Sequence, residues 1–164
     1  MPKLAACLRS VKASTTQRAG RSLTVAEVDF ILPQNLRIVW PYVRTRLDRL
    51  AMRSKSEWIQ EDVFLACATG KATLHTIKES GELTGFFVLE QTQEFGTPSL
   101  HVWVMWHDGT ADDALYSEVL EQLKRYGYAG KAARLRFSTT RKGWAKRLER
   151  FGWKPTLQYL EITL

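Results

Sequence analysis

The sequence lacks the signatures of several large protein classes. It has two cysteines, Cys7 and Cys67, which stand far apart and outside any C-x-x-C or Cys/His spacing, so neither a zinc site nor a disulfide framework is predicted. No apolar run approaches the eighteen or so residues of a membrane span, and "LAACL" near the start is too short for the core of a signal peptide. We therefore expect a soluble protein from a reducing compartment, with no metal and no membrane partner.

Acidic residues are absent from the beginning of the chain. The first is Glu27, and residues 1–58 contain eleven Lys and Arg against four Asp and Glu. Residues 59–164 contain thirteen of each, so the formal net charge of +7 belongs to the first third of the chain. The cations that precede any acid are Lys3, Arg9, Lys12, Arg18 and Arg21.

Residues 1–22 are predicted to form a basic arm without a core of its own, and residues 23–164 to form one domain. The arm's cations favour a surface rich in carboxylates or phosphates, on another protein or a nucleic acid. Leu4, Leu8 and Val11, at i, i+4 and i+7, predict one helical stripe that fits an apolar groove. A solvated tail and a transit peptide are the alternatives for this segment.

Apolar periodicity divides the rest of the chain into strands and helices. Helical spacing begins at Asn35 and includes Pro41 early in the helix, and Asp112 or Asp113 is expected to cap a later helix. The predicted order is a strand at 28–32, helices from 35 and at about 56–69, strands at 72–79, 83–91 and 98–107, a helix from 113, a strand at 133–138, a helix at 143–151 and a strand at 156–164.

This order resembles the GNAT (N-acetyltransferase-like) fold along residues 27–164. "WPYVRTRLDRL" followed by "EDVFLACATGKATLHTI", together with the closing "RKGWAKRLERFGWKPTLQYLEITL", resembles small GNAT-like proteins encoded in phage structural gene clusters. The resemblance implies a single α/β (α+β) domain, with a central mixed, mostly antiparallel sheet flanked by helices.

In active members of that superfamily, a turn after the fourth strand carries an R/Q-x-x-G-x-G/A pattern, which binds the pyrophosphate of acetyl-CoA. Its glycines let backbone amides approach the phosphates, and the following helix offers its positive N-terminus. The matching turn here, "MWHDGTADD" at 105–113, has one glycine and three aspartates, and we expect it to oppose a diphosphate. Its central, degenerate residues are His107, Asp108, Gly109, Thr110 and Ala111.

The catalytic positions that the resemblance implies are also altered. The general-acid Tyr falls at Leu148, which cannot donate a proton. The candidates for a general base are Glu90, His101 and His107, each of which has a packed or solvated role as its alternative. The segment "STTRKGW" at 138–144 has cations, Arg141 and Lys142, that suit phosphate near a helix start, but an ordinary basic loop is the favoured interpretation.

Trp103 and Trp106 differ by three positions, so simple alternation predicts that they face opposite sides of their strand and that one of them lines a groove or a partner surface. Together these features favour a non-catalytic GNAT-fold protein of a phage virion or its assembly, located in the virion or the host cytoplasm. Such a protein uses no cofactor, belongs to an oligomeric assembly and contacts other assembly proteins or nucleic acid. The alternative is an acetyl-CoA-dependent N-acetyltransferase with a degenerate cofactor turn.

Overall fold

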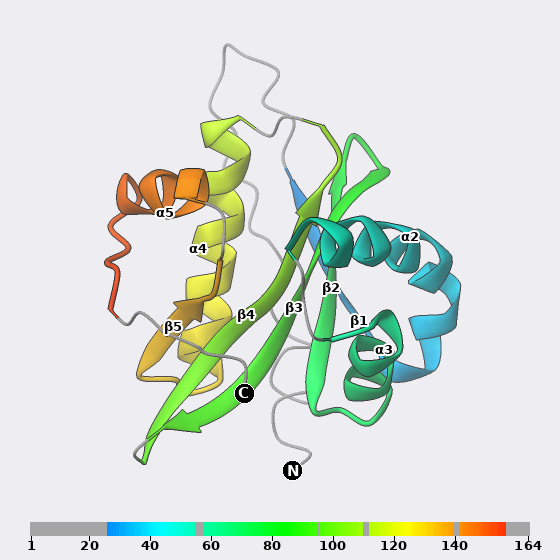
Figure 1. Cartoon of the computed structure of the whole chain (residues 1–164), viewed down its shortest axis with the longest axis horizontal. Coiled ribbons are helices and arrows are strands. Elements are labelled where there is room, and N and C mark those ends of the chain that lie inside the picture. Colours follow the sequence, from blue (N-terminus) through cyan, green and yellow to red (C-terminus); the bar gives the residue numbers. More distant parts are fainter. Residues whose placement is uncertain (1–25, 55–57, 95, 110–111, 140–141, 157–164) are drawn as a thin grey trace, which may run out of the picture.

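The fold is built on one mixed sheet, seen in a computed structural model that describes residues 26–54, 58–94, 96–109, 112–139 and 142–156 (Figure 1). Its strands are β1 (Glu27–Ile31), β2 (Ala72–Glu79), β3 (Glu82–Glu94), β4 (Thr97–His107) and β5 (Arg134–Phe137). They lie side by side in chain order, antiparallel from β1 to β4, and β5 is parallel to β4. The predicted α+β class is confirmed.

Helices cover both faces of the sheet (Figure 1). One face carries the 3-10 turn η2 (Pro33–Asn35), α2 (Leu36–Ser54) and α3 (Gln60–Ala68), and the other carries α4 (Asp113–Ala129) and α5 (Lys142–Glu149). None of the described helices combines the length and the apolar character needed to cross a membrane. The predicted arm at 1–22 lies outside the described residues, and so do most of the predicted final strand and its end at 164.

Two apolar clusters hold these layers together. On the α4 face, Val119 and Leu123 pack against Phe87 and Val102, and on the α2 face, Val43 and Leu47 pack against Phe86. Full burial of one such side chain contributes roughly 1.5–3 kcal/mol to folding. The apolar residues at helical spacing in α2 and α4 therefore form the faces by which these helices pack on the sheet.

The second helix begins later than its periodicity predicts. It starts at Gln60 rather than near 56, with a capping box in which the backbone N–H of Ile59 donates to the carboxylate of Asp62 at 3.0 Å. Trp40 of α2 meets Phe64 of α3 edge to face, with ring centroids 4.8 Å apart, and this contact fixes the helix pair.

A bulge in β4 changes which side chains share a face. Val88 of β3 pairs with Val104, whereas the next residue, Leu89, pairs with Val102, so Trp103 is an extra residue in β4. Trp103 and Trp106 consequently pack on the same cluster under α2 and α3. The prediction that they face opposite sides is wrong, because alternation does not continue through a bulge.

Candidate functional site

A pocket of about 620 Å³ opens where β4 parts from β5. The strand β5 pairs with residues Ser99 to Val102 only, so the later part of β4 has no strand beside it on this edge in the described chain. The pocket is lined by the end of β4, the last turns of α2 and residues of α4 and α5. Its volume falls within the range of small-molecule sites in proteins.

Three guanidinium groups line this pocket. Arg49 and Arg53 come from α2, and Arg147 comes from α5. The Arg53 guanidinium carbon lies 5.7 Å from the ring centroid of Trp106, and that of Arg147 lies 3.8 Å from the ring centroid of Tyr116. These aromatic faces help to orient the two cations.

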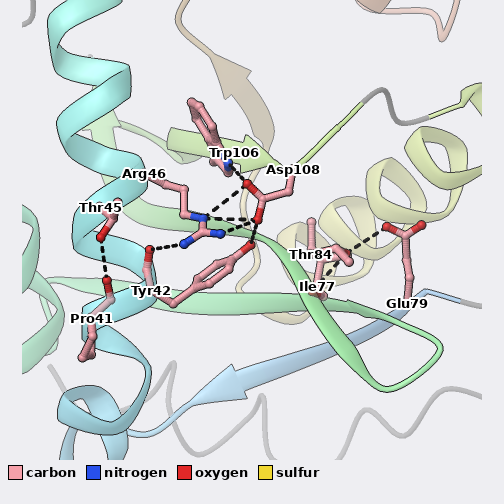
Figure 2. Close-up of polar contacts among 9 residues, drawn as sticks. All are labelled: Pro41, Tyr42, Thr45, Arg46, Ile77, Glu79, Thr84, Trp106 and Asp108. Carbon is pink, nitrogen blue, oxygen red and sulfur yellow. Dashed lines mark hydrogen bonds and ion pairs between the residues drawn. The ribbon is translucent and has the colours of Figure 1, made fainter.

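Among the described residues that line the pocket, Asp108 supplies the one carboxylate, and it is directed toward α2 (Figure 2). It accepts hydrogen bonds from Arg46 Nη2 at 2.7 Å, Tyr42 Oη at 2.8 Å and Trp106 Nε1 at 2.9 Å. Burial acts to raise the pKa of Asp108, but these hydrogen bonds outweigh it and lower the pKa to about 2. The carboxylate is thus ionised and already neutralised by Arg46.

The two aspartates at the start of α4 also have partners. Asp112 is the N-cap, since its Oδ1 accepts from the backbone N–H of Leu115 at 2.8 Å, as one of the two predicted caps. Asp113 Oδ1 pairs with Arg147 Nη2 at 2.7 Å, and its Oδ2 lies 3.3 Å from Arg150 Nη1. Thr110 and Ala111 of the same turn lie outside the described residues.

His107 is the candidate base that lines the pocket. Its Nε2 lies 2.6 Å from Glu79 Oε1, which also accepts from Thr84 Oγ1 at 2.8 Å. Gly85 lies opposite His107 in β3, where a Cβ would come within 2.7 Å of the Trp106 carbonyl oxygen and 3.2 Å of His107 Cδ2. The imidazole therefore lies over a glycine and is oriented by a carboxylate.

Glu90 and His101 lie elsewhere. They are opposite each other on β3 and β4, with His101 Nδ1 3.9 Å from Glu90 Oε2 and His101 Nε2 3.1 Å from Ser138 Oγ. Because Leu89 and Val102 beside them face α4, this pair faces the other side of the sheet, and neither residue lines the pocket.

Two further side chains have structural roles. Leu148, at the position that the resemblance gives to a proton donor, is buried at 6% exposure in the α4 cluster. Cys67 is a buried residue of α3 in the cluster on the α2 face, and burial raises the pKa of its thiol to about 12, so it is not a nucleophile at neutral pH. Among the described residues, no group of three or more His, Cys, Asp and Glu is placed to hold a metal ion.

Sequence reasoning did not find several pocket residues. It gave no binding role to Arg49 or Arg53, and it singled out neither Tyr116 nor Arg147. The only signal for Arg147 was the basic segment at 138–144, which ends one turn before it.

Solved structures supply the comparison with known proteins. A probable acetyltransferase has a TM-score of 0.63 at 17% identity, covering 84% of this chain and 97% of its own. A predicted acetyltransferase with acetyl-CoA from Clostridium acetobutylicum has a TM-score of 0.64 at 9% identity, covering 85% and 96%. The chain has the GNAT fold. No family model matches it, and no curated protein matches it significantly.

A third GNAT-fold structure, AAC(6')-Iy in complex with the bisubstrate analog CoA-S-monomethyl-acetylneamine, has a TM-score of 0.64 at 10% identity and covers 85% of this chain and 98% of its own. At these identities the likeness concerns the fold, and the chemistry has to be argued from the residues of the pocket.

Proposed function

We propose that the protein is an acyl-CoA-dependent acyltransferase that binds acetyl-CoA in the pocket at the end of β4. The observation that carries this proposal is the set of three arginines gathered where β4 leaves β5. The structural neighbours named above, which include one with acetyl-CoA and one with a CoA-linked analog, support it. The pocket has the size and the charge for a phosphorylated cofactor.

The pocket is less negative than the three aspartates of its turn predict. Three free aspartates would repel a diphosphate by about 4 kcal/mol for each pair of unit charges 4 Å apart at an effective dielectric constant of 20. Asp108 is instead neutralised by Arg46, and Asp113 by Arg147 and Arg150. Arg49 and Arg53 then remain to bind phosphate oxygens, and the guanidinium fork suits that geometry.

The free edge of β4 supports the same cofactor. From Trp103 to His107, its outward backbone amides and carbonyls are not paired with β5. An extended chain that contains amide groups, such as the pantetheine arm of coenzyme A, adds to such an edge through main-chain hydrogen bonds. The pocket therefore offers cations at one end and a strand edge along its wall.

Acyl transfer to an amine requires one group that takes a proton from the amine and another that gives one to the leaving thiolate. His107 and Tyr116 are the pocket-lining side chains with ionisable or hydroxyl protons suited to these steps. Glu79 orients the His107 ring, whereas Leu148 has no part in proton transfer. We assign the two proton transfers to His107 and Tyr116.

Titration calorimetry with acetyl-CoA tests this proposal. We expect the protein to bind the cofactor, and Arg49→Ala combined with Arg53→Ala to weaken binding at least roughly tenfold, since each charge-assisted hydrogen bond contributes about 1.5–3 kcal/mol. The matched control is Arg37→Ala with Arg44→Ala, two exposed arginines of the same helix outside the pocket. No heat of binding at millimolar acetyl-CoA, or equal weakening by both pairs, overturns the proposal.

A non-catalytic assembly protein is the second candidate. Two observations favour it. The carboxylate of Asp112 already accepts the hydrogen bond of the Leu115 amide at the α4 N-terminus, and Leu148 is buried. The sequence resemblance to phage-encoded GNAT-like proteins suggests a virion or its assembly as the setting, with the basic arm as the contact segment. On this reading, deletion of residues 2–22 leaves the thermal midpoint unchanged and abolishes incorporation into particles. Wild-type incorporation of the truncated protein contradicts it.

A further inference from the structure

Three polar side chains lie together where β5 ends, outside the pocket described above. Ser138 directly follows β5, and His101 and Glu90 lie opposite each other on β4 and β3. His101 Nε2 is 3.1 Å from Ser138 Oγ, and His101 Nδ1 is 3.9 Å from Glu90 Oε2. The imidazole therefore has a hydroxyl at one nitrogen and a carboxylate near the other.

This order of groups is that of a nucleophile, a base and a residue that orients the base. When Nδ1 of His101 carries its proton toward Glu90, the lone pair of Nε2 accepts the hydroxyl proton of Ser138. The separation of 3.9 Å exceeds a hydrogen bond, but Glu90 is 41% exposed, so its side chain has room to rotate toward the imidazole once that ring is charged. A solvated cross-strand pair accounts for Glu90 and His101 but not for a hydroxyl brought to the second nitrogen by another strand.

The site is open to solvent and has aromatic rings beside it. Ser138 is exposed, and it lies at the edge of the sheet away from α2 and α3 in the described chain (Figure 1). Trp103, two residues after His101 in β4, meets the ring of Trp58 edge to face, with centroids 6.4 Å apart. Both indoles are half-buried, so they offer an apolar surface next to the imidazole.

Arg136 adds a positive charge on the same face of the sheet. It lies directly opposite His101 in the parallel pairing of β4 and β5, and its neighbours Leu135 and Phe137 pack on the other side, against the α4 cluster. A guanidinium has five N–H donors, so it can keep a protein partner and still bind an oxyanion. Its position suits the negative charge that develops on a carbonyl oxygen when a hydroxyl attacks the carbonyl carbon.

We propose that Ser138, His101 and Glu90 hydrolyse carboxylic esters that carry an apolar group. Ser138 Oγ bonds to the carbonyl carbon while its proton passes to His101 Nε2, and the alcohol then leaves with that proton. Water attacks the resulting serine ester and gives a proton to Nε2, and Ser138 Oγ leaves and takes that proton back. The products are a carboxylic acid and an alcohol, with water as the second reactant. None of the three residues is among the described residues that line the pocket at the end of β4, so this activity is separate from the proposed acyl transfer.

Hydrolysis of p-nitrophenyl acetate by the full chain, without coenzyme A, tests this activity. We expect Ser138→Ala and His101→Gln each to lower kcat/KM at least roughly hundredfold, since they remove the nucleophile and the base. Glu90→Gln should lower kcat and leave KM unchanged, which loss of a merely structural contact would not do. The matched control is Ser117→Ala, an exposed serine on α4, which should keep the wild-type rate.

A fluorophosphonate probe identifies the nucleophile without any variant. We expect peptide mass spectrometry to find the probe on Ser138 of the wild-type protein and His101→Gln to lose this label. Because Ser138 is exposed, Ser138→Ala should keep the wild-type thermal midpoint. Failure of the wild-type protein to hydrolyse the ester, a label on another residue, or hydrolysis by Ser138→Ala at the wild-type rate each overturns the proposal. None of these results bears on acetyl-CoA binding, which calorimetry tests separately.

Discussion

Arg46 in α2 and Asp108 directly after β4 form an ion pair in which Nη2 and Oδ2 are 2.7 Å apart. The guanidinium carbon of Arg46 also lies 3.6 Å from the ring centroid of Tyr42, whose hydroxyl donates to the same carboxylate. Figure 2 shows these side chains meeting between the helix and the strand end. One carboxylate thereby ties α2 to the wall of the pocket.

Replacing this carboxylate should destabilise the protein measurably. Asp108→Ala leaves Arg46, Tyr42 and Trp106 without their acceptor, and we expect a loss of about 1–3 kcal/mol in the free energy of unfolding, measured by urea denaturation. The comparison is Glu61→Ala, which removes the exposed ion pair with Arg44 and should cost under about 1 kcal/mol. Similar losses for the two variants would show that the Asp108 network is not a structural tie.

His75 should make the protein sensitive to mild acid. Complete burial among Phe30, Phe87 and Tyr126 lowers its pKa from 6.5 to about 3. The folded protein therefore keeps His75 neutral, while the unfolded chain takes up a proton as the pH falls below 6.5, and stability is lost progressively from that pH toward 3.

Urea midpoints at pH 7, 6 and 5 measure this effect. The slope of the free energy of unfolding against pH approaches about 1.4 kcal/mol per pH unit for one proton, and His75→Phe should flatten it. Asp108, with its lowered pKa, adds a further loss only below its unfolded pKa of 3.8, outside this window. An unchanged slope in His75→Phe would mean that another group titrates.

Asp112 offers a test in which stability and binding move separately. Asp112→Ala removes the N-cap of α4 and should cost about 0.5–2 kcal/mol, while Asp112→Asn keeps a capping oxygen. Because Asp112→Asn also removes a negative charge beside the helix N-terminus, we expect it to bind acetyl-CoA more tightly than the wild-type protein. Weaker binding by Asp112→Asn would show that the carboxylate itself assists the ligand.

Alanine at two glycine positions should change the stability of the protein in opposite directions. A Cβ at Gly85 meets the Trp106 carbonyl oxygen at 2.7 Å, so Gly85→Ala forces β3 and β4 apart and should cost about 1–3 kcal/mol. A Cβ at Gly127, inside α4, meets nothing within 4 Å, and Gly127→Ala should stabilise the helix by roughly 0.5–1 kcal/mol. Thermal melts of the two variants give both signs, and a shift in the same direction for both would contradict the packing around β3.

Local patterns predict much of this fold. The helix predicted from 113 is α4, which packs on the sheet through Leu115, Val119 and Leu123, and the strand predicted at 72–79 is β2 with its observed bounds. These predictions succeed because burial of one face dictates the spacing of apolar residues over short distances. The cap at Asp112 follows from the same local chemistry.

The pocket depends on contacts between distant segments. Arg53 of α2 and Arg147 of α5 line the same pocket although these helices are far apart in the sequence, and no local spacing connects the two residues. The direction of Asp108 depends on Arg46, which precedes it by 62 positions. A list of residue types in the turn gives its charge, whereas the charge felt by a ligand depends on which partners the fold brings there.

The bulge at Trp103 divides β4 into two halves whose patterns run in opposite phase. Leu100 and Val102 face α4, whereas Val104 and Trp106, still at even numbers, face α2. Loss of a single residue at this point would turn every later side chain of the strand over, moving the pocket wall and His107 to the wrong layer. The length of β4 at this position is therefore a stricter requirement than the identity of the residue that fills it.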